Sequence, residues 1–163
     1  MKKGLVIADS GPIFSLALID ELKILHDLFD EIRIPNAVWE EITLNKTTKF
    51  YKKILDFFEP KVTKISGFND LTFLMDYGES ESLILYKELN ADFLLIDDKK
   101  ARSIAENFNI YCIGILGLLS TAKTKGLIEE LRPHFIMLLK NNRYYSIKLL
   151  NVLLDKHNEQ KII

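Results

Sequence analysis

The sequence predicts an α/β fold built on a mainly parallel sheet, and three observations support this. Short apolar runs that are typical of buried strands alternate with longer segments that are typical of helices. This alternation predicts βαβ units, whose right-handed crossovers bring the carboxyl ends of the strands to one edge of the sheet. A chain of 163 residues with 48% hydrophobic composition is also large enough for one domain with a sizeable core.

Apolar runs bounded by turn residues predict the strands. The first run ends at Asp9 and the second is stopped by Pro35, which cannot continue a central strand. The run before Asp97 and the run before Gly114 are equally short and apolar. The predicted strands are 4–8, 31–34, 93–96 and 111–114, with a short edge strand at 62–65.

Helices are predicted between and after these strands. Gly11-Pro12 turns the chain from the first strand into a helix, and Pro35 and Gly78 each precede another one. The predicted helices are 13–28 with a break near Asp20, 36–44, 46–58, 79–90, 98–108, and most of 115–157 with breaks near Gly126 and Arg132-Pro133.

The helical end of the chain is predicted to be an extension of the α/β unit. We assign residues 1–130 to an α/β domain and residues 131–163 to a helical extension that packs on the same domain or on a partner. Leucines recur at helical spacing near the end, and such an apolar face is normally buried. They are Leu149, Leu150, Leu153 and Leu154. This face predicts a homodimer or a docking surface for a small partner protein.

Composition narrows the class of protein. The net charge is −1, so any affinity for nucleic acid must come from a local basic surface. No apolar run reaches the roughly 18 residues of a membrane span, so no membrane association is expected. The single cysteine, Cys112, excludes an intrachain disulfide framework and favours a cytoplasmic location.

Four carboxylates are the best candidates for chemistry: Asp9, Glu41, Glu81 and Asp98. Asp9 and Asp98 follow apolar runs, and ligands of open α/β sheets bind at the carboxyl ends of strands. Acids gathered there repel one another unless a cation or proton lies between them. Since Mg²⁺ and Mn²⁺ prefer oxygen ligands, the pattern predicts a metal-dependent phosphodiester hydrolase.

Asp9 and Glu41 also have explanations without a function. Asp9 or Ser10 could cap the helix that follows the first strand. Glu41 borders the apolar stripe that includes Val38, whereas Glu40 points roughly to the opposite side of its helix. Glu41 is therefore the better candidate for an inward acid, and an exposed helical glutamate is the alternative.

The other acids come in pairs, and the choice within each pair is open. Glu79 and Glu81 lie at a predicted helix start, where the helix dipole favours negative charge. Glu81 falls on the side of Leu85, so it is preferred and Glu79 is held as a supporting candidate. One of Asp97 and Asp98 can cap the next helix, which leaves the other to be explained.

Short motifs in a fixed order along most of the chain carry a family resemblance. They are Val6-Ile7-Ala8-Asp9-Ser10, Ile34-Pro35-x-x-Val38-x-x-Glu41-Ile42, Gly78-Glu79-x-Glu81, Leu95-Ile96-Asp97-Asp98-Lys99-x-x-Arg102, the segment from Gly114 to Ile128, and Arg143, Ser146 and Leu149 near the end. Together they resemble the PIN domain, and in particular its DUF3368 subgroup.

The resemblance implies a three-layer α/β/α sandwich and a Mg²⁺- or Mn²⁺-dependent ribonuclease. Many such proteins dimerise, and many are toxins of type II toxin–antitoxin pairs that a small antitoxin holds inactive. By motif, the family's acids fall on Asp9, Glu41, Glu81 and Asp98, with Asp97 as a close alternative, and Ser10 matches the hydroxyl residue beside the first acid. Two departures are the glutamate at the third acid, where many PIN domains have aspartate, and Ile96, which replaces a common Thr or Ser.

Basic residues beside the last acid are the candidates for RNA binding. Lys99, Lys100 and Arg102 follow Asp98 directly and would offset the repulsion between an acidic site and a phosphate backbone. One rival is a non-catalytic binding module with the same fold. A second rival is a phosphoacceptor receiver domain, but that class needs paired acids after the first strand, where Asp9 stands alone.

Overall fold

A parallel sheet forms the centre of the molecule. The computed structural model describes residues 3–163. Its five-stranded sheet has the order β3-β2-β1-β4-β5, and every neighbouring pair is parallel. The strands are β1 (Leu5–Ala8), β2 (Glu31–Pro35), β3 (Val62–Thr63), β4 (Phe93–Leu95) and β5 (Cys112–Ile113).

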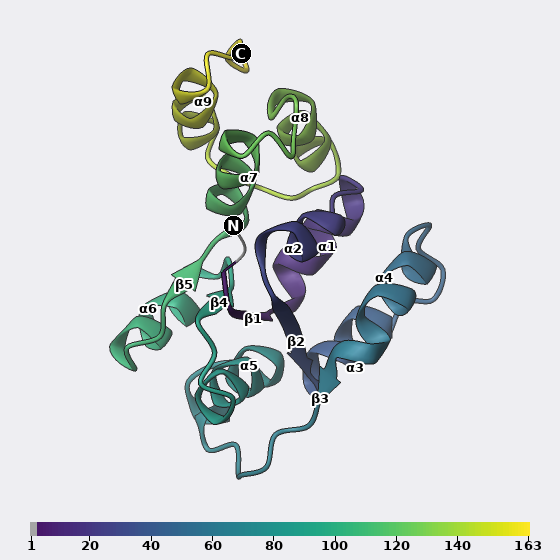
Figure 1. Cartoon of the computed structure of the whole chain (residues 1–163), viewed down its shortest axis with the longest axis vertical. Helices are drawn as coiled ribbons and strands as arrows, with labels where there is room; N and C mark the ends of the chain where they lie inside the picture. The colour runs from purple at the N-terminus through teal and green to yellow at the C-terminus, as the bar shows by residue number, and fades with distance from the viewer. Residues whose placement is uncertain (1–2) are drawn as a thin grey trace.

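Helices cover both faces of this sheet. The helices are α1 (Ser10–Leu18), α2 (Lys23–Leu28), α3 (Asn36–Thr43), α4 (Tyr51–Phe58), α5 (Tyr77–Glu88), α6 (Lys99–Asn107), α7 (Ile115–Thr124), α8 (Arg132–Lys140) and α9 (Ile147–Lys156), with short 3-10 turns η1 (Glu59–Lys61) and η2 (Leu71–Phe73). Helices α5 and α6 lie on one face, and α1, α2 and α7 lie on the other (Figure 1). The predicted three-layer α/β/α sandwich is confirmed.

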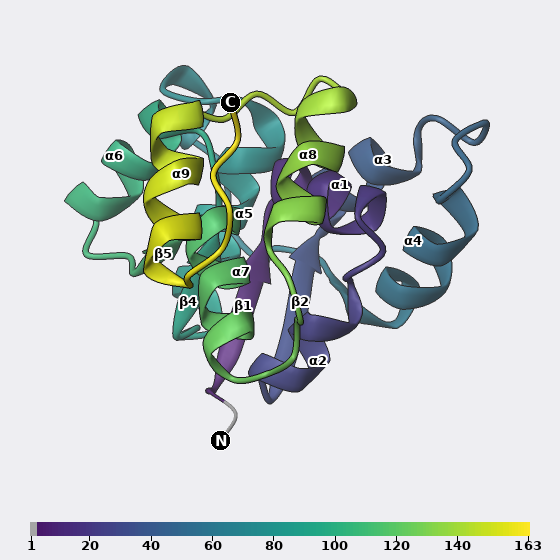
Figure 2. The ribbon, with the colours of Figure 1, turned by 90° about the horizontal axis from the view of Figure 1, so that it is seen from above.

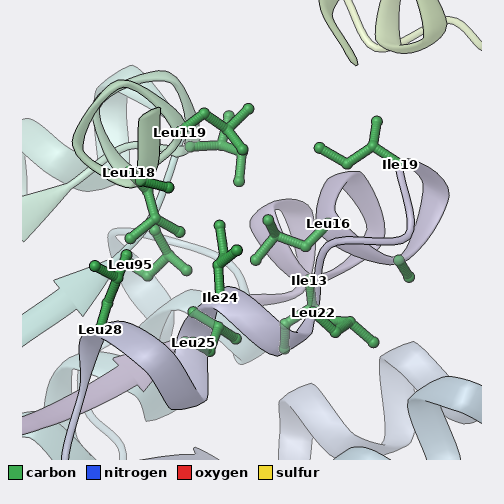
Figure 3. Packing of buried hydrophobic residues seen from close by; sticks show 14 of the residues in the cluster. Ile13, Leu16, Ile19, Leu22, Ile24, Leu25, Leu28, Leu95, Leu118 and Leu119 are labelled. Carbon is green, nitrogen blue, oxygen red and sulfur yellow. The ribbon is translucent and has the colours of Figure 1, made fainter. Parts of the chain in front are cut away.

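Alternation along the central strands explains these layers. In β1, Val6 and Ala8 belong to a large apolar cluster, whereas Ile7 between them belongs to a second cluster with α5 and α6. Successive side chains of a strand point to opposite faces, so a strand that is apolar throughout must be covered on both faces. Figure 3 shows the larger cluster, in which side chains of α1, α2, β4 and α7 converge.

The strand order creates a switch point between β1 and β4. The chain runs outward from β1 to β2 and β3, and then returns to lay β4 on the other side of β1. The arrows of β1 and β2 point the same way in Figure 2. The carboxyl ends of β1 and β4 therefore meet at the place where open α/β sheets bind their ligands.

Several predicted boundaries were wrong, and local chemistry explains them. Helix α1 begins at Ser10 rather than near 13, because Pro12 fits the first turn of a helix. The predicted breaks near Gly126 and Arg132-Pro133 fall on the one connection between α7 and α8, and Pro133 lies in the first turn of α8. Helix α4 begins at Tyr51 rather than 46. The predicted break near Asp20 is confirmed, since this residue has a φ of 58°.

The helices after residue 131 pack on the large cluster. Leu150 and Leu154 of α9 are fully buried there, together with Leu138 of α8. Figures 1 and 2 show α8 and α9 beside α7. Other apolar side chains of α9 stay exposed, namely Ile147, Leu149 and Val152. Among the helices of residues 3–163, none has the length and apolar character needed to cross a bilayer.

Candidate active site

Asp9 lies at the switch point between β1 and β4. Its backbone N–H donates to the carbonyl of Leu95 at 2.9 Å, which extends the β1–β4 ladder by one residue. Its side chain is only 6% exposed. Although Asp9 precedes α1, its side chain makes no capping hydrogen bond, and its buried Oδ1 has no hydrogen-bond partner within residues 3–163. The capping explanation for Asp9 therefore has no support in the structure.

Other acids surround Asp9 and act on its titration. Burial raises the pKa of Asp9 to about 8, the backbone N–H of Ser10 opposes this, and the charges of Glu79, Glu41 and Asp76 add to it. A buried carboxylate among like charges is costly to ionise, because burial removes water and the Ser10 N–H offsets only part of the cost. The carboxyl groups from α3 and α5 thus face the end of β1.

Glu41 reaches this group from α3. Burial raises its pKa, a hydrogen bond with the Ser10 hydroxyl opposes the shift, and the charge of Asp76 adds to it. A Cβ atom on Gly78 would lie 2.9 Å from Glu41 Oε2. Gly78 therefore leaves the space that the Glu41 carboxylate occupies against α5.

Glu79 is the residue of α5 whose charge interacts with Asp9 and Asp98. It forms a capping box with Asp76, in which Asp76 Oδ1 accepts from the Glu79 N–H at 2.8 Å. Burial, then the charges of Asp76 and Asp98, raise the pKa of Glu79 to about 7. Sequence reasoning missed Asp76, although Asp-x-x-Glu before a helix is the signal of a capping box.

Glu81 points to a different place from Glu79. Its side chain is 5% exposed, as the helix-face argument from Leu85 predicted for an inward residue. Its Oε2, however, accepts a hydrogen bond from the backbone N–H of Ala37 at 2.9 Å, in the first turn of α3. Glu81 thereby ties α3 to α5, whereas Glu79 lies with Asp9.

Asp97 and Asp98 divide two structural roles at the end of β4. Asp98 Oδ1 accepts from the Ala101 N–H at 2.8 Å and caps α6. Asp97 Oδ1 accepts from the Ile115 N–H at 2.8 Å, and its Oδ2 accepts from the Tyr145 hydroxyl at 3.0 Å. Both oxygens of Asp97 are therefore engaged, whereas Asp98 faces Glu79 and the cleft.

A cleft of about 1450 Å³ runs past this cluster, and most of the predicted site lines it. The acids that line it are Asp9, Asp76, Glu79, Asp97 and Asp98. Ser10 and the predicted RNA-binding residues Lys99 and Arg102 line it as well. Lys100 is exposed outside that lining. Glu41 and Glu81 do not line the cleft. Glu41 is an exposed residue of α3, which differs from the inward position predicted for it, and Glu81 is turned to the backbone of α3.

The acids around Asp9 fit a divalent cation by their chemistry. Within residues 3–163, no three carboxylate, imidazole or thiol side chains already stand close enough together to hold a metal ion. Two observations still fit one: the buried Asp9 Oδ1 lacks a partner, and the pKa values of Asp9 and Glu79 are raised to about 8 and about 7. A cation that prefers oxygen ligands would give Asp9 Oδ1 a partner. Its positive charge would also lower the pKa values of Asp9 and Glu79.

Comparison with known proteins agrees with this architecture. The family described as DUF3368: PIN domain matches residues 5–159, which is nearly the whole chain. A comparison with curated proteins gave no match. PIN domains are generally nucleases and typically use divalent metals. The carboxylates found at the end of β1 and around it suit that class, and the chain therefore belongs to the DUF3368 family of PIN domains.

Proposed function

We propose that this protein is a ribonuclease that depends on Mg²⁺ or Mn²⁺. One observation carries the proposal: a buried Asp9 oxygen without a partner in residues 3–163 lies among carboxylates at the switch point of a nuclease-type fold. Nothing in an apolar core requires such an arrangement, because an unpaired buried carboxylate destabilises the folded state.

Four carboxylates would hold the cation: Asp9, Glu41, Glu79 and Asp98. A cation bound there would acidify a water and neutralise charge that develops on the scissile phosphate. Lys99 and Arg102 line the same cleft and would hold the phosphate backbone beside Asp98. Asp98 Oδ2 remains available for this role, since the α6 cap uses Oδ1.

Glu79 is our choice for the third acid, in place of Glu81. Glu79 raises the pKa of Asp9, and Asp98 raises that of Glu79, so these acids face one another. Glu81 accepts from the Ala37 N–H, and the charges that raise the pKa of Asp9 are those of Glu79, Glu41 and Asp76. Glu81 would then act by fixing α3, which carries Glu41.

Cleavage of a labelled single-stranded RNA by the full chain tests the proposal. We expect Mn²⁺ or Mg²⁺ to support cleavage and EDTA to abolish it. Asp9→Asn should lower the rate about 100-fold or more, the size expected when a group acting at the reacting centre is removed. Glu40→Gln is the matched control, because Glu40 is an exposed glutamate beside Glu41. Metal-independent cleavage, or equal losses in both variants, would contradict the proposal.

We further propose that the ribonuclease is a cytoplasmic toxin that a small antitoxin holds inactive, and that it forms a homodimer. The exposed apolar side chains of α9 support an interface, since Leu150 and Leu154 are buried in the chain's own core while Ile147, Leu149 and Val152 are not. Sedimentation of the full chain and of Val152→Glu tests the dimer. If both the wild-type chain and Val152→Glu sediment as monomers, the proposed homodimer is contradicted. Growth arrest on expression, relieved by a small neighbouring gene, tests the toxin.

A further inference from the structure

The segment that follows α8 reaches back to the first turns of α1, next to Asp9. Arg143 Nη2 donates to the carbonyl of Gly11 at 2.7 Å, and Arg143 Nε donates to the Ser15 hydroxyl at 3.0 Å. Arg143 and Gly11 are 132 positions apart in the sequence. A charge-assisted donor with a planar, fixed fork geometry restrains both acceptors at once.

Tyr145 continues this contact to the end of β4. Its hydroxyl lies 3.2 Å from Ser15 Oγ and donates to Asp97 Oδ2 at 3.0 Å. A hydroxyl has one proton, so Tyr145 must accept from Ser15, and Ser15 in turn accepts from Arg143. Donor and acceptor roles thus follow in one direction, from the guanidinium through two hydroxyls to the carboxylate.

Asp97, the last acceptor of this hydrogen-bond network, has donors on both of its carboxylate oxygens. Burial raises the pKa of Asp97, and the hydrogen bonds from the Ile115 N–H and the Tyr145 hydroxyl, with the charges of Arg143 and Arg102, oppose this. Its neighbour Asp98 faces Glu79 across the cleft. The network therefore fixes both sides of the switch point: the first turns of α1, which directly follow Asp9, and the Asp97-Asp98 pair after β4.

We infer that Arg143 and Tyr145 are positioning residues, which hold the start of α1 beside Asp9 and the end of β4 in the arrangement that binds the divalent cation. This inference rests on the proposed function. Neither side chain touches the reacting phosphate in this role. They act through Gly11, Ser15 and Asp97, as outer partners that orient ligands usually do.

Titration of the full-length protein with Mn²⁺, followed by calorimetry, tests the inference without any substrate. Tyr145→Phe removes only the hydroxyl, and Arg143→Met removes the guanidinium. Each should weaken Mn²⁺ binding about 10-fold or more, as is typical when a partner of a ligand is lost. Arg143→Lys should restore part of the affinity, because it keeps one donor and the charge near Asp97.

Two controls separate positioning from general destabilisation. Tyr144→Phe removes the hydroxyl of the neighbouring tyrosine, which is 80% exposed and donates to Asn142, so Mn²⁺ affinity should not change. Leu150→Val destabilises α9 from its buried side without touching the network. It should lower the melting temperature of the metal-free protein and leave the affinity as it was.

The dependence of RNA cleavage on Mn²⁺ concentration supplies a second readout. For Tyr145→Phe the half-saturating concentration should rise, and excess Mn²⁺ should restore most of the wild-type kcat. If Tyr145→Phe and Arg143→Met both bind Mn²⁺ with wild-type affinity, the inference is overturned while the proposed function stands. A loss in Leu150→Val as large as in Tyr145→Phe would overturn the inference as well. Absence of Mn²⁺ binding by the wild-type chain would overturn the proposed function, and the inference with it.

Discussion

Asp9 and Asp97 occupy equivalent places in the fold and have opposite surroundings. Asp9 directly follows β1, and Asp97 follows β4 after one residue. These two strands are neighbours in the sheet. Burial raises the pKa of both. Asp97 has donors on both oxygens and two arginines nearby, whereas Asp9 Oδ1 has no partner in residues 3–163 and faces acids. Position at a strand end therefore does not distinguish a ligand from a structural carboxylate, but the set of partners does.

Glu79 and Glu81 repeat this contrast on one helix. They are two residues apart in α5, so their side chains leave the helix in different directions. Glu81 accepts from the backbone of α3, whereas Glu79 stands among Asp9, Asp76 and Asp98. The more buried of the two is the one with the structural contact.

The largest expected effect separates these two glutamates. Glu79→Gln should reduce metal-dependent RNA cleavage about 100-fold or more, because it removes an acid that faces Asp9. Glu81→Gln keeps an oxygen that can accept from Ala37 and should cost much less activity. Cleavage rates at saturating Mn²⁺ measure both. A larger loss in Glu81→Gln would restore Glu81 as the third acid of the site.

The next effect is a difference in sign between Asp9→Asn and Asp97→Asn. Near neutral pH and without metal, Asp9→Asn should stabilise the fold by about 2 kcal/mol or more, about 4–8 °C in melting temperature, because the folded state otherwise has to keep a proton on Asp9, whose pKa is raised to about 8. Asp97→Asn should destabilise it by about 1–3 kcal/mol, because a carboxylate that accepts two hydrogen bonds is lost. Thermal unfolding in EDTA measures both. Destabilisation by both variants would end the contrast between these two aspartates.

The pH dependence of stability has the same physical cause and a definite sign. Folded Asp9 has a pKa of about 8 against 3.8, and folded Glu79 about 7 against 4.5. The folded state keeps protons that the unfolded state has lost, so the metal-free protein should lose stability as pH rises from about 4 to about 8. Below that window both states are protonated, and above it both are ionised.

Denaturant unfolding across this pH range measures the effect. The difference between wild type and Asp9→Asn isolates Asp9 from the other titrating groups. That difference should grow with pH in EDTA and shrink when Mn²⁺ is added, because the cation stabilises the ionised form. A difference that stays constant with pH would show that Asp9 is already ionised in the metal-free fold.

The smallest effect concerns Gly78. In Gly78→Ala the new Cβ would meet Glu41 Oε2, which is the end of a flexible side chain, so the fold should tolerate it while the carboxylate moves. We expect weaker Mn²⁺ binding with a stability change below about 1 kcal/mol. Gly117→Ala is the control, since within residues 3–163 no atom from outside its own helical turns lies within 4 Å of a Cβ there. Equal Mn²⁺ affinity in the two variants would show that the position of Glu41 does not matter.

The sequence by itself determined the parallel sheet and the edge at which the acids after its strands lie. Short, fully apolar runs with helical segments between them specify parallel strands that are covered on both faces. These are local patterns, and the burial of each depends mainly on its own neighbours in sequence. The acids at the ends of β1 and β4 could therefore be named from the chain alone.

Only the tertiary structure decided which partner each acid has. Asp97 is engaged by Tyr145, which lies 48 positions away, and Glu81 by Ala37, which lies 44 positions away. Hydrogen bonds of this kind depend on how helices from distant parts of the chain pack, which no period in the sequence records. A buried carboxylate becomes structural when such a donor reaches it, and stays available to a cation, as Asp9 does, when none in the described chain does.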